Sequence, residues 1–306
     1  MRVIHLAHLF VMVLPLACAE SELESPGPLS LVKSAALAGG AAGLITHAGV
    51  DVTMTYAGAS QVYLTNASSS WPSQPDLESP AVVAVVDTDD GLVTVDAAGT
   101  WRWRDSQGVA QSLAGPTPLQ LIRSGDVLYA PLGPGGVATA PTDLAAPPTL
   151  LPGLEGTLDL AVMPQGRWLL ARADAGVSVT ENRKVVTTMG LGGPVLRVRY
   201  PYGLPPLALT TSSLVVLDVD GRNVEASVTI PLSGSCRSLE TEPNIHWVYV
   251  ACTDRLHVLD LANPTRPVRI GTLVLGGERV LGVVEYTDEE LLVRGRDDVS
   301  WVELVP

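Results

Sequence analysis

The chain has 306 residues, of which 46% are hydrophobic and 17% are charged, and its formal net charge at pH 7 is −13. This composition is too apolar for a disordered chain and supplies enough side chains for a large core. Basic residues do not gather into a stripe, which argues against nucleic-acid binding, because such binding depends on contacts to phosphates.

Residues 1–18 have the layout of an export signal. Arg2 is the only charge before Glu20, and the apolar run Val3–Leu16 is too short to span a bilayer. Two processing routes stay open. Cleavage after Ala17-Cys18-Ala19 would release a soluble periplasmic or secreted protein. Alternatively, Leu14–Cys18 resembles the lipobox of bacterial lipoproteins, in which the cysteine is acylated.

We favour lipidation of Cys18, because a lone cysteine at the cleavage site of an exported protein would otherwise be an unpaired thiol. Residues 19–30 are acidic, contain two prolines and are interpreted as a flexible tether, followed by one folded domain over 31–306. An acidic surface disfavours contact with anionic headgroups, so the lipid would be the only membrane contact. By resemblance to lipoproteins, Ala19 after the cysteine points to the outer membrane, or to a periplasm-facing lipoprotein.

A short apolar strand closed by an aspartate returns at multiples of about 40 residues. Its clearest copies are Leu92–Asp96, Leu214–Asp218 and Leu256–Asp260. A period of this size in an all-strand pattern predicts an all-β fold, a single β-propeller. We count seven four-stranded blades, or six if the first unit, which contains the alternating stretch Val50–Tyr56, is an irregular extension.

The two ends of the chain are predicted to share one blade. Arg279–Tyr286, Glu290–Arg294 and Ser300–Val305 make three strands, and Leu29–Leu37 is a spare strand at the other end. Pairing of the N- and C-terminal strands would close the ring and remove an open sheet edge.

Two phrases resemble known repeats. Tyr249–Ala251 and Leu256–Asp260, followed by Asn263-Pro264, resemble the LVIVD repeat of bacterial exported propellers. Val216–Asp220 followed by Ala226–Pro231 is similar to the YVTN-type repeat of surface-layer propellers. The resemblance implies a β-propeller repeat protein of the bacterial cell envelope. Some relatives by fold are lactonases and other hydrolases.

Two cysteines remain after the signal, Cys236 and Cys252. If a hairpin turn centres on Asn244, residues whose numbers sum to 488 face each other, and the two cysteines are opposite. Cross-strand Cα atoms lie about 4.5–5.5 Å apart, within reach of a disulfide, and exported proteins meet an oxidising compartment. We therefore predict a Cys236–Cys252 disulfide, with two buried free thiols as the alternative.

Candidates for chemistry are few, and we assign no catalytic residue and no cofactor. Asp87, Asp89 and Asp90 resemble part of a calcium loop, but the third alternating ligand and the distal glutamate are missing, so they are weak metal candidates. Acidic pairs such as Glu240 with Glu242 are interpreted as solvated turn residues. Mid-strand His257 is expected to be a hydrogen-bonded interior residue. Trp101–Arg104 is interpreted as an outer strand with alternating faces rather than a recognition patch.

These observations favour a non-enzymatic role. The leading hypothesis is a monomeric, membrane-anchored scaffold that binds an envelope protein or glycan. The competing hypothesis is a lactonase-like propeller hydrolase with acidic residues at the axis of the ring. A sensor domain for a small envelope ligand is the third possibility.

Overall fold

The computed structural model describes most of the chain from residue 29 onward. The described residues are 29–36, 41–46, 51–56, 61–66, 77–78, 82–88, 91–105, 108–242, 246–279, 282–287, 290–294 and 298–304. Within these ranges no helix has the length and apolar character needed to cross a membrane. The signal and tether predicted for residues 1–18 and 19–30 lie outside the described residues, apart from the last two.

The described residues form an all-β structure, interrupted only by a single 3-10 turn at Pro164–Gly166. Strands that follow each other in the chain pair antiparallel, as short connections require. The first two sheets along the chain are β2 (Ala41–Thr46), β3 (Asp51–Tyr56), β4 (Gln61–Asn66) and β5 (Leu77–Glu78), then β6 (Val82–Thr88), β7 (Gly91–Asp96), β8 (Thr100–Asp105) and β9 (Gly108–Ala114).

Two further sheets have the same plan of four consecutive strands. They are β10 (Ile122–Ser124), β11 (Val127–Pro131), β12 (Val137–Pro141) and β13 (Thr149–Leu151), then β14 (Thr157–Met163), β15 (Arg167–Arg172), β16 (Gly176–Glu181) and β17 (Lys184–Met189).

The remaining sheets cover the last third of the chain and its beginning. They are β18 (Val195–Arg199), β19 (Leu207–Thr210), β20 (Ser213–Asp220) and β21 (Asn223–Pro231); β22 (Ser238–Glu242), β23 (Trp247–Asp260) and β24 (Val268–Arg279); and β25 (Gly282–Thr287), β26 (Glu290–Arg294), β27 (Asp298–Leu304) and β1 (Leu29–Ala36).

β23 contains both middle strands of its sheet. The chain turns back inside it near Asp254, which has a left-handed φ of 62°. The amide of Leu261, just after β23, donates to the carbonyl of His246, just before it, at 2.8 Å. The two halves therefore lie side by side, which recovers the four-strand plan predicted for this unit.

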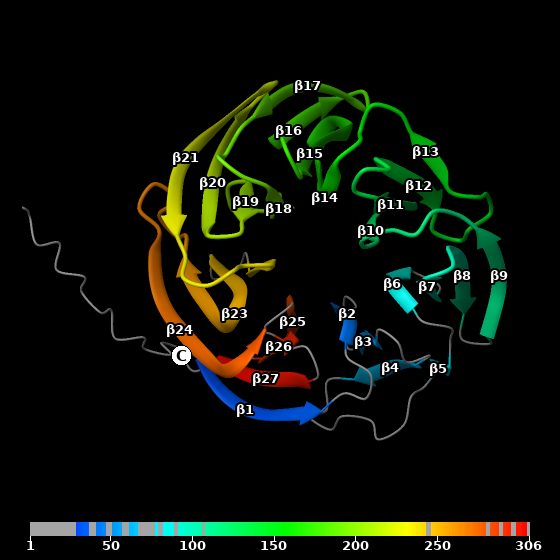
Figure 1. Ribbon diagram of the computed structural model, residues 1–306, viewed down its shortest axis with the longest axis horizontal. Helices are drawn as coiled ribbons and strands as arrows, with labels where there is room; N and C mark the ends of the chain where they lie inside the picture. The colour runs from blue at the N-terminus through cyan, green and yellow to red at the C-terminus, as the bar shows by residue number, and fades with distance from the viewer. Residues whose placement is uncertain are drawn as a thin grey trace, which may run out of the picture.

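The sheets stand around a common centre, with β2, β6, β10, β14, β18 and β25 innermost and β1 at the rim (Figure 1). Inner strands of successive sheets contact one another: β2 with β6, β6 with β10, β14 with β18, β18 with β22, β22 with β25, and β25 with β2. All four residues of β19 are buried, because neighbouring sheets cover both of its faces. β17, at the rim, alternates between exposed and half-buried residues.

The core lies between neighbouring sheets and is mainly aliphatic. Leu209 and Val216 pack against Val250 and Leu259 of the next sheet in one apolar layer. Similar layers lie between successive sheets from that of β6–β9 to that of β14–β17 and β18–β21, and between β22–β24 and the sheet of β25–β27. Burying each such side chain contributes about 1.5–3 kcal/mol. Valine and leucine suit this position because they pack well on a pleated surface.

The terminal strands meet as the sequence suggested. β1 pairs antiparallel with β27, from Leu29 opposite Leu304 to Ala36 opposite Asp298, with a register shift between Leu31 and Lys33. Figure 1 shows β1 in blue beside β27 in red.

The recurring aspartate has a local structural role in two of its copies. Asp96 Oδ1 accepts hydrogen bonds from the amides of Ala98 and Thr100, both at 2.9 Å. Asp260 Oδ1 accepts one from the amide of Ala262 at 2.7 Å. An aspartate after the strand thus stabilises the turn that follows it. Asp218 is exposed and has no such bond in the structure.

Candidate functional site

The candidate site is a cluster of polar side chains on the inner strands, which we call the central cluster. Its members are Gln120, Asp159, Arg197, Arg199 and Glu240. They come from four successive sheets: Gln120 lies two residues before β10, and the others lie in β14, β18 and β22. Figure 1 places β10, β14 and β18 around the centre of the molecule.

Asp159 is the buried hub of the central cluster, with a fully inaccessible side chain. Its Oδ1 accepts hydrogen bonds from the amide of Leu160 at 2.8 Å and from the Gln120 side chain. Its Oδ2 accepts the amide of Val198 at 3.0 Å and Nη1 of Arg199 at 3.1 Å. One carboxylate thus joins three sheets, and each of its oxygens is satisfied, as a buried charge requires.

Register shifts in the inner strands accompany this arrangement. One lies between Thr157 and Asp159 in β14, and another between Val195 and Arg197 in β18. Such bulges redirect side chains and are common beside functional sites. β2 and β6 carry register shifts at equivalent positions, so the bulge is a feature of the repeat. In β14 and β18 this bulge lies beside residues of the central cluster.

Arg199 bridges the two carboxylates. Its Nη1 binds Asp159, and its Nη2 lies 3.8 Å from Oε2 of Glu240. The side chains of Arg199 and Glu240 are 28% and 27% exposed, so both reach the surface. Burial acts to lower the pKa of the Arg199 guanidinium, but the carboxylates of Glu240 and Asp159 outweigh it and hold that pKa above its ordinary value.

In its pair with Arg199, Glu240 is the residue whose charged form is disfavoured. Burial raises the pKa of its carboxyl, and the charge of Asp159 adds to the rise. Arg199 and the amide of Thr241, which donates to Oε1 at 3.1 Å, oppose the shift without cancelling it. The ionised form of Glu240 is therefore disfavoured, whereas the charge on Arg199 is stabilised.

Arg197 carries a charge with no carboxylate partner among the described residues. Its Nη1 donates to the carbonyl of Leu196 at 3.2 Å, and the side chain is half-buried. Burial holds the pKa of this guanidinium below its ordinary value, although Asp159 acts in the opposite direction. An arginine stays protonated at neutral pH even so, and its remaining donors are available to an acceptor.

The central cluster suits recognition of charged groups. Both carboxylates face arginines, and the described part of the chain brings together no group of three His, Cys, Asp or Glu side chains fit to hold a metal. Two guanidinium groups on one inner strand can bind a carboxylate, phosphate or sulfate.

The sequence interpretation missed these residues and was wrong about Glu240 and Glu242. Both lie in β22, and neither is a solvated turn residue; Glu242 is 7% exposed. A signal was present, because Gln120, Asp159, Arg199 and Glu240 follow one another at intervals of 39, 40 and 41 residues. That spacing is the repeat period, which puts equivalent positions of adjacent inner strands side by side.

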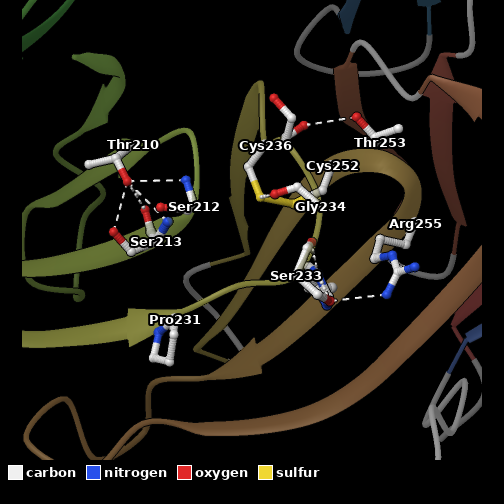
Figure 2. Close-up of a disulfide and its surroundings, with 12 residues drawn as sticks. Thr210, Ser212, Ser213, Pro231, Ser233, Gly234, Cys236, Cys252, Thr253 and Arg255 are labelled. Atoms are coloured by element: carbon white, nitrogen blue, oxygen red, sulfur yellow. Dashed lines mark hydrogen bonds between the residues drawn. A yellow bond between two sulfur atoms is a disulfide. The ribbon is translucent and has the colours of Figure 1, made fainter. Parts of the chain in front are cut away.

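Cys236 and Cys252 form a disulfide, in agreement with the pairing inferred from the sequence (Figure 2). The predicted ladder register was wrong by one, since β22 and β23 pair residues whose numbers sum to 489. The amide of Thr253 donates to Ser235 and that of Arg237 to Ala251. One extra residue just before β22 therefore shifts the register by one, and Cys236 lies opposite Cys252.

The disulfide lies in a tightly packed corner. Both cysteines are fully buried, and the Cys236 amide donates to the carbonyl of Thr211 in the preceding sheet at 2.8 Å. Gly234 has φ +86°, and a Cβ there would meet Thr253 O at 3.1 Å and Cys252 Cβ at 3.3 Å. Only glycine fits this approach without strain.

His257 is a buried, hydrogen-bonded residue, as expected from its mid-strand position. Its Nδ1 lies 3.0 Å from Oγ1 of Thr272, and its Nε2 lies 3.0 Å from the carbonyl of Ser233. Nε2 therefore carries the proton, because a carbonyl can only accept. Arg255 donates to the hydroxyl of Ser233 in the same corner (Figure 2).

Trp101–Arg104 is a strand segment within β8, but the prediction of an outer strand was wrong by one position, because β9 pairs with β8 on its outer side. Trp101 is fully buried and its Nε1 donates to the carbonyl of Pro116 at 2.9 Å, while Trp103 packs against the same apolar layer. Arg102 pairs with Asp96 at 2.7 Å. These tryptophans serve the core.

The remaining candidates fall largely outside the described residues. Cys18, Asp89 and Asp90 lie there, and Asp87 is placed only as a backbone position in β6. The calcium interpretation of this loop and the lipidation of Cys18 stay predictions.

Comparison with solved structures identifies the architecture. The chain is similar to the WD40 propeller domain of Doa1, with a TM-score of 0.76 and 11% identity over 90% of this chain and 97% of that one. It is also similar to virginiamycin B lyase from Staphylococcus aureus (TM-score 0.71, 9% identity, 90% and 100% covered). A third neighbour is YCF48 bound to D1 peptide (TM-score 0.67, 10% identity, 94% and 100% covered). The fold is a β-propeller.

At these identities the likeness concerns the fold alone. No protein-family model matches the chain, and no curated protein sequence matches it. The arrangement of sheets around a centre, with one edge strand of each sheet innermost, is the propeller plan, and it puts the central cluster on strands at the propeller axis.

Proposed function

We propose that this protein is an exported β-propeller, anchored to the bacterial envelope through lipidated Cys18, that acts as a scaffold binding an envelope protein or glycan. The ring would have seven blades and be closed by β1 and β27. The pairing of these strands and the contacts of β25 with β22 on one side and β2 on the other support that closure.

The central cluster is the observation that carries the binding proposal. It puts partly exposed charged groups on the inner strands of a rigid scaffold, where side chains from several sheets can meet one ligand. Propellers of the same fold occur in complexes with proteins or peptides: YCF48 is bound to the D1 peptide, and another neighbour is part of the mitotic checkpoint complex. A binding role fits this precedent.

The binding proposal is tested by crosslinking in intact cells. The wild-type protein should give a discrete adduct with an envelope component, whereas the variant Arg199→Ala should lose it while keeping its fold by circular dichroism. A wild-type protein that yields no adduct in its own envelope would refute the scaffold.

The anchor is tested separately by feeding cells an alkyne-tagged fatty acid. The wild-type protein should take up the label and fractionate with membranes, and Cys18→Ala should do neither. If Cys18→Ala stays with the membrane fraction, the lipoprotein proposal fails and the binding proposal is unaffected.

A propeller hydrolase of the lactonase type is the second candidate, and one observation favours it. A partly exposed carboxyl with a raised pKa, such as Glu240, is typical of a general acid. Turnover of a panel of lactones by the wild-type protein, abolished in Glu240→Gln, would establish this alternative, and its absence would remove it.

A further inference from the structure

The inner strand β18 runs directly into an exposed aromatic loop. Arg197 and Arg199 are followed by the sequence Tyr200-Pro201-Tyr202-Gly203-Leu204, which connects β18 to β19. Tyr200 is 38% exposed and Tyr202 is 94% exposed, the largest exposure among the described large apolar residues. Tyrosine and arginine are among the residues enriched at the centres of protein interfaces.

This loop is held in place at its base. Leu204 is buried in the apolar layer between the sheet of β18–β21 and the sheet of β22–β24. The carbonyl of Pro206 accepts the amide of Leu217 at 2.8 Å. Gly203, with φ +78°, makes the turn between Tyr202 and Leu204. A fixed loop that projects a tyrosine loses little entropy when that side chain binds a partner.

The charges beside the loop differ from those of the rest of the molecule. The chain has a net charge of −13, yet Arg197 is a half-buried cation without a carboxylate partner among the described residues. A buried charge is stabilised when it is paired. An incoming anionic group would supply that pair, and the neighbouring ion pair of Arg199 with Asp159 would hold β18 in place while it binds.

We propose that Arg197 and Tyr202 form a docking site for an extended peptide segment that presents a carboxylate to Arg197 and an apolar side chain to Tyr202. The proposal rests on the binding function proposed above and specifies its partner. A peptide suits the loop better than a glycan does. Sugar hydroxyls need many hydrogen-bonding partners, and residues 200–206 offer two tyrosine hydroxyls and no Asn, Gln, Asp or Glu.

The test uses the processed full-length protein, purified in detergent, and a displayed library of random peptides as the probe. Wild-type protein should enrich peptides with an Asp, a Glu or a free carboxyl terminus. Binding of an enriched peptide, followed by fluorescence anisotropy, should weaken roughly ten- to a hundred-fold in Arg197→Gln, because a charge-assisted hydrogen bond is lost. Arg266→Gln, at an exposed arginine between β23 and β24, is the matched control and should bind as wild type does.

A thermodynamic cycle identifies the contact. Changing the acidic residue of the peptide to its amide should weaken binding to the wild-type protein as much as the Arg197→Gln substitution does. The same change in the peptide should weaken binding to the Arg197→Gln variant only slightly. If Arg197→Gln does not fold, Tyr202→Ala replaces it, since a side chain that is 94% exposed supports no core. Tyr202→Ala should weaken binding several-fold.

The outcomes separate this inference from the broader function. Enriched peptides without acidic groups, or equal binding by Arg197→Gln and wild type, would overturn the docking site and leave the scaffold intact. Binding of an acidic polysaccharide such as alginate, with the same dependence on Arg197 and without peptide enrichment, would overturn the peptide assignment. A protein that enriches no ligand and gives no adduct in cells would overturn both proposals.

Discussion

Replacement of Asp159 by asparagine tests whether the central cluster holds three sheets together. The substitution keeps the shape of the side chain and its bond to the Leu160 amide. It replaces one acceptor oxygen with an NH2 group. That group would face the amide of Val198 and Nη1 of Arg199, which are also donors. Both donors would then lose their acceptor.

The expected cost follows from burial. A buried amide left without a partner costs about 1–3 kcal/mol. Removing the partner of a fully buried ion pair costs about 3–5 kcal/mol, but the 28% exposure of Arg199 lets water replace part of it. We expect Asp159→Asn to lower the free energy of unfolding by about 3 kcal/mol, and the midpoint of thermal unfolding by roughly 6–9 °C.

Urea titration at neutral pH measures this difference. Asp218→Asn is the matched control, because Asp218 is exposed and makes no hydrogen bond of its side chain in the structure. The double variant Asp159→Asn with Arg199→Met should lose less than the two single variants together. If Asp159→Asn and Asp218→Asn unfold at the same urea concentration, the hub role of Asp159 is wrong.

Three further predictions concern stability. Replacing both Cys236 and Cys252 by alanine should lower the free energy of unfolding by about 3 kcal/mol, since the cysteines close a loop with a sequence separation of 16; alkylation of both cysteines in the unreduced wild-type protein would contradict the disulfide. Burial acts to raise the pKa of Asp96, but the amide of Thr100 and the side chain of Arg102 hold it below its ordinary value, so this carboxylate stabilises the fold above about pH 4 and its contribution is lost as pH falls through the lowered pKa. Urea titrations of wild type and Asp96→Asn should therefore converge toward acid pH, and a constant gap would refute the assignment. For Glu240, whose pKa burial raises, the sign is opposite, because ionisation disfavours the fold. The stability of Glu240→Gln relative to wild type should therefore increase as pH rises above about 4.5, and a relative loss on the same titration would show that pairing with Arg199 dominates.

The strand pattern was readable from the sequence because it depends on local chemistry. The phrase Leu256–Asp260 is a short apolar run closed by its own turn aspartate, and the structure contains both the buried strand and the aspartate's hydrogen bond to the turn. The disulfide was also predictable, although the register was not. A bulge adds one residue without changing the apolar pattern on either side, so the residue before β22 that shifts the ladder leaves no trace in composition.

The central cluster was not found, for a physical reason. Asp159, Arg199 and Glu240 are each unremarkable within their own repeats, and their ion pairs span 40 and 41 positions in the chain. The residues next to Glu240 in the sequence therefore led to the wrong prediction that it lies in a turn. Only the arrangement of the sheets around a common centre makes these residues neighbours, because it converts one repeat period into one step between adjacent inner strands.

The same geometry explains why polar residues can accumulate at this position. Apolar layers between sheets bury the faces of each strand and tolerate few charges. The inner edge of each inner strand belongs to neither layer, so a charge there can pair with the equivalent position of the next sheet, as Asp159 pairs with Arg199. β14, β18 and β22 each contribute one such position, occupied by Asp159, Arg199 and Glu240. A chain can therefore change its central charges one repeat at a time without disturbing its core. Arg197 makes no ion pair with a carboxylate of the described residues, and a partner's carboxylate would supply one.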